Sequence, residues 1–226
     1  MTDVPVRDAA TMIVIRDAAG PRPSVLMGQR GKGAVFMPDK FVFPGGALDP
    51  SDSSALYAAP LPGRCQAVLS QGVGAGRASA LPAAAIRELW EETGLMLGKP
   101  GRWPNPPPAD WQGFAEAGYL PNAAALRYVF RAITPPGRPR RFDARFFLAD
   151  AANLVGDPDD FSRASDELSQ LQWIPLDAAR SFPLPFITEI VLAEVAAALP
   201  NLEPPEVVPF FDGTREEIEL RQLHGA

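Results

Sequence analysis

The chain has 226 residues, and its composition excludes several broad classes of protein. Hydrophobic residues make up 46% and charged residues 21%, which is typical of a globular chain and not of a disordered one. The formal net charge of -6 disfavours nucleic acid and anionic membranes as partners, because an acidic surface repels polyanions. A small phosphorylated ligand stays open, since a divalent cation in a local pocket can overcome the net charge.

The cysteine content and the hydropathy of the chain indicate the cellular compartment in which we expect the protein. Cys65 is the only cysteine, so no disulfide can form within the chain, which favours a reducing environment. Residues 1–10 include Asp3, Arg7 and Asp8 and lack the apolar core of a signal peptide. No run of about 18 apolar residues is present, so we expect no membrane span. These features predict a cytoplasmic protein without a membrane partner.

The first half of the chain begins with predicted strands. The β-branched run at residues 11–15 indicates a buried strand, and residues 17–21 have turn chemistry. Residues 24–28 are expected to return as the second strand of a hairpin. After a glycine-rich loop, the apolar run at residues 41–43 is closed by Pro44, Gly45 and Gly46.

An irregular segment and a strong helix follow. Residues 50–81 are rich in small and turn-prone residues, which indicates an insertion at about 53–81 with a short helix at residues 65–69. The pattern at residues 82–93 predicts a helix. Pro82 suits its first turn, and Gly94 suits the position just past its end.

The second half again mixes helices and strands. Residues 98–125 form a proline-rich segment with expected short helices at residues 108–117 and 123–126. Three strands and a last packing helix are expected at residues 128–133, 141–148, 168–174 and 186–199. The first two of these strands should form a hairpin around Pro135-Pro136-Gly137. A single α/β or α+β domain is therefore predicted.

Three carboxylates on the predicted helix are the main candidates for chemistry. Glu88, Glu91 and Glu92 are spaced so that all three can project to one side, and Arg87 can pair with Glu91. Taken alone, such a pattern is most often a solvated acidic face. Its surroundings in the sequence favour a functional site.

The residues from Arg87 to Leu95 read R-E-L-W-E-E-T-G-L. They match the second half of the Nudix box, R-E-U-x-E-E-x-G-U, in which U is aliphatic. The first half, G-x5-E after a strand ending in Pro-Gly-Gly, resembles residues 43–52, with Asp52 in place of the glutamate. The chain therefore resembles the Nudix hydrolase family, and this resemblance implies an α/β/α sandwich with a mixed sheet.

The two halves of the box lie unusually far apart in this chain. Positions 53 to 86 separate them, which are 34 residues where the family pattern has seven, so the box contains an insertion of 27 residues. An interrupted box resembles the branch that contains the peroxisomal coenzyme A diphosphatases. Residues 36–46 and 141–147 also resemble that branch.

The resemblance implies a metal-dependent diphosphate hydrolase that uses Mg²⁺ or Mn²⁺. Hard cations need several oxygen ligands, and the implied ligands are Glu88, Glu91, Glu92 and the Gly46 carbonyl. Arg87 would orient the glutamates, whereas Asp52 is an accessory carboxylate. The general base stays open between Glu88 and two carboxylates before a late strand, Asp166 and Glu167, of which Glu167 matches the family better.

The expected substrate is a small nucleoside diphosphate derivative, with coenzyme A or acyl-CoA favoured and ADP-ribose, NADH or another dinucleotide as alternatives. Cations that could contact its phosphates are Arg30, Lys32, Lys40, Arg141 and Arg145.

A nucleotide-sensing module without turnover is a further alternative, which the retention of all three glutamates disfavours. An isomerase is also disfavoured. His224, the only histidine, is the third residue from the end of the sequence, so a histidine-based triad or zinc site is not expected. The sequence leaves open whether the chain forms a homodimer.

Overall fold

The computed structural model describes residues 4–33, 36–71, 73–103, 106–215 and 217–225. In these residues a nine-stranded mixed sheet has the order β11-β10-β7-β8-β1-β2-β3, while β4 pairs with β1 and β9 pairs with β2. The strands of this sheet are β1 (Val6–Arg16), β2 (Ser24–Arg30), β3 (Phe41–Val42), β4 (Gly45–Ala47), β7 (Arg127–Ile133), β8 (Arg141–Asp150), β9 (Leu168–Pro175), β10 (Val207–Asp212) and β11 (Glu219–His224). A separate small sheet pairs β5 (Gly98–Pro100) with β6 (Tyr119–Pro121).

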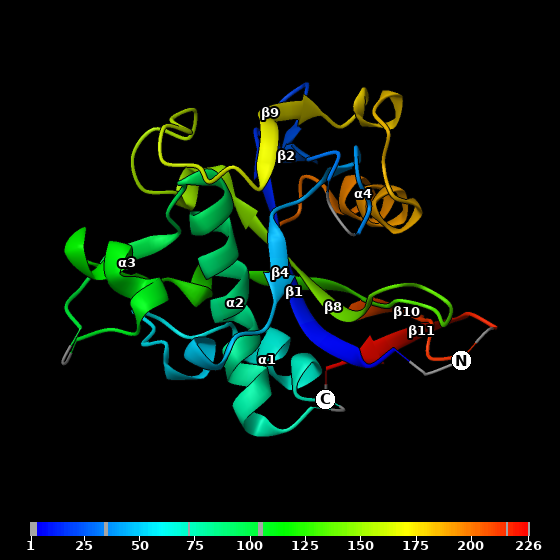
Figure 1. The fold of residues 1–226 in the computed structure, drawn as a ribbon, viewed down its shortest axis with the longest axis horizontal. Helices are drawn as coiled ribbons and strands as arrows, with labels where there is room; N and C mark the ends of the chain where they lie inside the picture. The colour runs from blue at the N-terminus through cyan, green and yellow to red at the C-terminus, as the bar shows by residue number, and fades with distance from the viewer. Residues whose placement is uncertain (1–3, 34–35, 72, 104–105, 216, 226) are drawn as a thin grey trace.

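Helices cover both faces of the large sheet (Figure 1). They are α1 (Gly63–Leu69), α2 (Ala75–Thr93), α3 (Gln112–Glu116) and α4 (Phe186–Ala198). In Figure 1, α1, α2 and α3 lie on one side of β1 and α4 lies on the other. The chain is thus an α/β/α sandwich with a mixed sheet, as its resemblance to the Nudix family implied.

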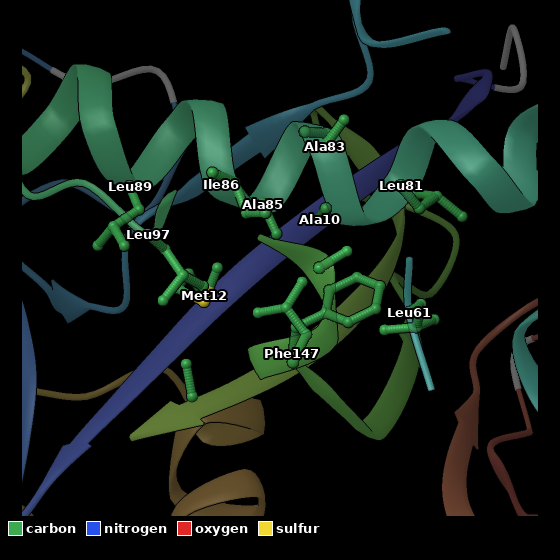
Figure 2. Close-up of a cluster of buried hydrophobic side chains, with 14 of the residues drawn as sticks. Ala10, Met12, Leu61, Leu81, Ala83, Ala85, Ile86, Leu89, Leu97 and Phe147 are labelled. Carbon is green, nitrogen blue, oxygen red and sulfur yellow. The ribbon is translucent and has the colours of Figure 1, made fainter. Parts of the chain in front are cut away.

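Each side of the sheet has its own hydrophobic cluster, as the alternation of side chains along β1 requires. Ala10, Met12 and Val14 face the α2 side, whereas Ile13 and Ile15 face the α4 side. Figure 2 shows side chains of α2 lying over β1 and over Phe147 of β8. This packing fixes α2 against the centre of the sheet, and so fixes the direction in which its polar residues point.

Most expected elements are present close to their predicted bounds. The first hairpin pairs Ile15 with Val25 in antiparallel register, and the second pairs β7 with β8. The short helix at residues 65–69 is α1, and the helix at residues 108–117 is split into a 3₁₀ turn (Ala109–Trp111) and α3. None of the helices in the described part of the chain combines the length and hydropathy that a bilayer crossing needs.

The start of the main helix differs from the prediction. The helix begins at Ala75 and not at Pro82, so Pro82 lies inside it. A proline there removes one backbone hydrogen bond, but Ala78 and Leu81 on the added turns are completely buried. The apolar contacts of these turns outweigh the general preference of proline for a first turn. The segment expected to loop out therefore contributes two turns of α2.

Several strands were not predicted because their sequences lack a strand pattern. β4 is formed by Gly45, Gly46 and Ala47, and it pairs with β1 although glycine has a low strand propensity. Pro209 interrupts the apolar run of β10, which pairs in parallel with β7. β11 is an exposed edge strand whose residues do not alternate in hydrophobicity. In each case the neighbouring strand, and not local propensity, determines the structure.

Candidate active site

The Pro-Gly-Gly segment meets α2 through β4, which pairs with β1 in the sheet and contacts the helix (Figure 1). The Gly45 N–H donates a hydrogen bond of 2.8 Å to Oε2 of Glu92. A Cβ atom on Gly46 would overlap the carboxylate of Glu88, so a side chain at this position would displace that carboxylate. The glycines therefore let the backbone of β4 approach two of the three helix glutamates. The sequence pattern pointed to Gly46, but it did not predict that the neighbouring N–H of Gly45 would hold Glu92.

Arg87 donates hydrogen bonds to two of the three glutamates of the cluster. Its Nη1 donates to Oε1 of Glu88 at 3.0 Å and to Oε2 of Glu91 at 2.8 Å. The guanidinium is buried, with 6% of the side chain exposed, and its Nη2 also donates to the Ala47 carbonyl at 3.2 Å. The expected pairing of Arg87 with Glu91 is present, and Arg87 also contacts Glu88.

Asp52 joins the first half of the box to Arg87. Its two oxygens accept hydrogen bonds from Nε and Nη2 of Arg87 at 2.8 and 3.1 Å, and its side chain is completely buried. Oδ2 also accepts from the Asp49 N–H at 2.8 Å, which caps a 3₁₀ turn (Pro50–Ser54). The Asp52 carboxylate is therefore engaged on the far side of Arg87 from Glu88 and Glu91.

The negative charges of the three glutamates are only partly balanced by nearby positive charge. Burial, with the charge of Glu88, raises the pKa of Glu92 to about 8, although the Gly45 hydrogen bond opposes this. Burial likewise raises the pKa of Glu88 to about 7, against the lowering effect of Arg87. Burial also raises the pKa of Glu91, the most exposed of the three. Because Arg87 is shared with Asp52, it does not neutralise the whole cluster.

The loop before β9 brings a fourth carboxylate to this end of α2. The Ser165 N–H donates to the Glu91 carbonyl at 3.2 Å, and Gly94 lies against the loop where a Cβ would come within 2.8 Å of the Arg163 Cβ. Gly94 ends α2 with φ of 74°, as predicted, so it serves both the helix end and this close approach. The charge of Glu167 raises the pKa of both Glu88 and Glu92. Both loop carboxylates are exposed.

Arg30 is the cation from the first hairpin that lies near the cluster. It ends β2, its charge acts on Glu92, and its Nε is buried without a hydrogen-bond partner among the described residues. Its backbone N–H donates to the Lys40 carbonyl at 2.9 Å, so Lys40 lies beside it. Lys32 lies on an exposed loop.

The structure does not bring Arg141 and Arg145 to the carboxylates. Arg145 is buried, with its guanidinium against Asp8 at 2.5 Å and Asp143 at 3.0 Å. Asp8 in turn pairs with Arg77, which precedes Glu88 by 11 residues on α2, roughly 16 Å along the helix axis. Arg141 is also buried and donates to the carbonyls of Thr134 and Gly213. Both arginines stabilise the sheet near the opposite end of α2.

The donor chemistry of the cluster suits a hard divalent cation, because oxygen ligands carrying excess negative charge are what such ions prefer. Within the residues that the structure describes, no three acidic, histidine or cysteine side chains already converge on a metal position. Arg87 holds Glu88 and Glu91, and Gly45 holds Glu92, so the carboxylates would have to turn partly away from these partners to share an ion. Glu91 has room to do so, with 38% of its side chain exposed.

The stability of the metal-free protein is expected to fall as the pH rises. Glu88 and Glu92 have pKa values of about 7 and 8 in the folded state and 4.5 when unperturbed. The folded state therefore keeps protons that the unfolded chain releases between about pH 4.5 and 8, so deprotonation disfavours folding over this window by up to roughly 1.4 kcal/mol per pH unit per proton. Urea unfolding in a chelator from pH 5 to 9 measures this slope. The Glu92→Gln variant should have a shallower slope, and equal slopes would contradict the assigned shift.

Comparisons with known proteins agree with the fold. No protein-family model matches the chain. It is 30% identical over 180 residues to nudix hydrolase 7 of Caenorhabditis elegans, covering 74% of this chain and 51% of that protein. It is 28% identical over 230 residues to acyl-coenzyme A diphosphatase NUDT19 of Gallus gallus, covering 74% of this chain and 60% of that protein. The chain thus spans about half to three fifths of the length of these curated relatives.

A solved structure is similar over nearly its whole length. The NUDIX hydrolase from Alicyclobacillus acidocaldarius superposes with a TM-score of 0.64 at 30% sequence identity, covering 86% of this chain and 92% of that chain. The two chains therefore share their fold over most of their length. With its box residues assembled on β4 and α2, the chain belongs to the Nudix hydrolase family.

Proposed function

We propose that the chain hydrolyses the diphosphate linkage of a nucleoside diphosphate derivative. One observation carries this proposal: Glu88, Glu91 and Glu92 are gathered with less positive charge than they need, and burial raises the pKa of each. A purely structural acidic face would be solvated, whereas Glu92 is 2% exposed. Such a cluster costs stability in the free protein, which is expected of a site made to bind cations.

Mg²⁺ or Mn²⁺ is the proposed cofactor, with Glu88, Glu91, Glu92 and the Gly46 carbonyl as ligands. When bound, the cation would neutralise charge on the diphosphate oxygens and lower the pKa of a water molecule. Arg87 would orient Glu88 and Glu91 through its existing hydrogen bonds, and Asp52 would hold Arg87 in place from behind.

Glu167 is the proposed general base, with Glu88 as the alternative. Glu167 is exposed to the solvent from which the attacking water comes, and it lies close enough for its charge to act on Glu88 and Glu92. It would accept the proton of that water as the water attacks phosphorus. Asp166 is the weaker choice, because Glu167 matches the family pattern better.

Arg30 is the proposed contact to the substrate diphosphate. Its buried Nε lacks a hydrogen-bond acceptor in the described residues, and a buried donor without a partner is costly. A phosphate oxygen would accept a hydrogen bond from this donor. The positive charge of Arg30 would also offset the negative charge of a phosphate that lies beside the glutamate cluster. Lys40 beside it can approach the same phosphates.

Coenzyme A or acyl-CoA is the favoured substrate. The interrupted box is the feature that resembles the coenzyme A diphosphatase branch, and one curated relative is named as an acyl-coenzyme A diphosphatase. ADP-ribose, NADH and other dinucleotides remain alternatives, because the diphosphate chemistry would be the same for each.

Mass analysis of the products tests both the reaction and the substrate. The protein is incubated with coenzyme A, ADP-ribose or NADH in the presence of Mg²⁺ or Mn²⁺. Coenzyme A is expected to give a phosphopantetheine product and adenosine 3′,5′-bisphosphate, with one water consumed for each bond broken. Preferential cleavage of ADP-ribose or NADH would overturn the substrate assignment, and absence of any cleavage would overturn the reaction.

A nucleotide-sensing module is the alternative from another class. It would bind one of these compounds without turnover, and its affinity would not depend on the helix glutamates. Retention of Glu88, Glu91 and Glu92 in a charge-deficient cluster argues against it, because a sensor does not need ligands for a reactive cation. The alternative isomerase reading is also disfavoured, since Cys65 is buried and burial raises the pKa of its thiol.

A further inference from the structure

The last strand of the large sheet, β11, has one side without a partner strand. It pairs with β10 from Glu219 to His224, and within the described residues no strand follows it in the sheet order. The backbone N–H and C=O groups that point outward from such an edge can pair with another chain. β11 contains no proline, and its register with β10 is unbroken, so two features that commonly block such pairing are missing.

An apolar patch lies on the α4 side of this edge. Leu220 is 76% exposed and lies directly opposite Phe211 of β10, which belongs to the hydrophobic cluster beneath α4. Phe186, at the start of α4, is 68% exposed and contacts the ring of Phe211, with the ring centroids 6.3 Å apart. Phe211 therefore joins the two exposed side chains into one patch, and contiguous exposed apolar surface is typical of an interaction site.

The opposite face of β11 has two charges of opposite sign. Glu219 and Arg221 flank Leu220 in the strand, so both side chains point to the other side of the sheet. Their side chains are 60% and 56% exposed, and Arg221 also lies 2.8 Å from Asp212 of β10. Along the strand, β11 therefore presents an acidic, an apolar and a basic side chain in succession. This order becomes complementary to itself when one copy of the strand is reversed.

We propose that β11 pairs in antiparallel orientation with β11 of a second copy of this chain, about a two-fold axis at Leu220. In this register Leu220 lies opposite Leu220 of the second copy, and Glu219 lies opposite Arg221 of the second copy on each side of the axis. Opposing residues of an antiparallel pair share a face of the sheet. The two apolar patches therefore meet on one face, and two ion pairs form on the other.

The charges of β11 favour this register over its neighbours. An axis at Arg221 would place two arginines opposite each other, and an axis at Glu219 would place two glutamates there, and like charges in opposing positions are destabilising. A shift by a single residue would bring charged positions opposite the apolar one on the wrong face. The pairing does not depend on the proposed diphosphate chemistry, because β11 is separated from β1 in the sheet order by β10, β7 and β8.

Sedimentation velocity over a series of protein concentrations tests the association. The wild-type mass is expected to rise from 24.2 kDa towards twice that value, with a dissociation constant of roughly 1–100 µM, as is typical of a small interface. Leu220→Lys places two positive charges at the axis and should weaken association at least about tenfold. The matched control is Leu56→Lys, since Leu56 is also exposed and lies between the 3₁₀ turn Pro50–Ser54 and α1. A wild-type chain that stays monomeric throughout, or equal association of the two variants, would overturn the proposal.

A disulfide trap tests the register. Opposing Cα atoms of an antiparallel pair lie about 4.5–5.5 Å apart, which is within the range that a disulfide can bridge. Leu220→Cys is therefore expected to form a covalent dimer under mild oxidation, whereas Leu56→Cys should remain monomeric on a non-reducing gel. The native Cys65 is buried and should not contribute. Thermal unfolding of each variant under reducing conditions verifies that it folds. Equal amounts of covalent dimer from the two variants, or none from Leu220→Cys, would overturn the two-fold axis at Leu220.

Discussion

Glu92→Gln is expected to lower kcat at least about 100-fold with the substrate that the product analysis identifies. An amide cannot supply the negative charge that a divalent cation needs, and a loss of this size corresponds to about 2.7 kcal/mol of transition-state stabilisation. The amide oxygen can still accept the Gly45 N–H, so β4 and α2 should stay together. The measurement is steady-state kinetics at saturating Mg²⁺ or Mn²⁺.

The matched control for this variant is Glu194→Gln. Glu194 is exposed on α4, which covers the opposite face of the sheet, so its change should leave kcat within about twofold. Thermal unfolding without metal separates chemistry from folding. Removing a buried carboxylate with a raised pKa should leave the melting temperature of Glu92→Gln unchanged or higher. Full activity in Glu92→Gln would exclude the proposed metal site.

Arg87→Met is expected to lower the free energy of unfolding by about 3–5 kcal/mol. Arg87 is the cation that neutralises the buried Asp52 carboxylate, to which it donates two hydrogen bonds. Its removal leaves that charge buried, with the Asp49 N–H as its one remaining hydrogen-bond donor in the part of the chain that the structure describes. Urea unfolding of the wild type and the variant in the same buffer measures the difference.

An exposed ion pair provides the comparison. Arg22 is 64% exposed and lies 3.6 Å from Asp177, so Arg22→Met should cost less than about 0.5 kcal/mol. The double variant Asp52→Asn, Arg87→Met should recover part of the loss, because the uncompensated charge is then gone. An effect of Arg87→Met no larger than that of Arg22→Met would mean that the buried pair does not hold the box together.

The glutamates could be predicted because their spacing alone determines how they project from a helix. Glu88, Glu91 and Glu92 lie on one face of α2 as the i, i+3, i+4 pattern requires. Gly94 was predictable for a similar reason, since a left-handed residue at a helix end strongly favours glycine. The metal and catalytic roles of these glutamates stay predictions.

What could not be predicted depends on contacts between distant segments. The sequence does not show that Asp52 and Arg87, 35 residues apart, form a buried bidentate pair. It gives equal weight to Arg30 and Arg145. Only the fold shows that Arg145 pairs with Asp8 and Asp143, whereas Arg30 has near Glu92 an Nε without a partner among the described residues. The true start of α2 depends in the same way on the core that Ala78 and Leu81 join.

The Asp52–Arg87 pair makes the geometry of the box independent of the length of chain between its halves. In a polymer description, extending a flexible connection from seven to 34 residues costs only roughly 1.4 kcal/mol of closure entropy, and the packing of α1 and the early turns of α2 can offset that cost. The interval between Asp52 and Arg87 is thus a place where new structure can be added without disturbing the carboxylates. A motif that is written as a fixed spacing in sequence is, in this chain, maintained by an ion pair in space.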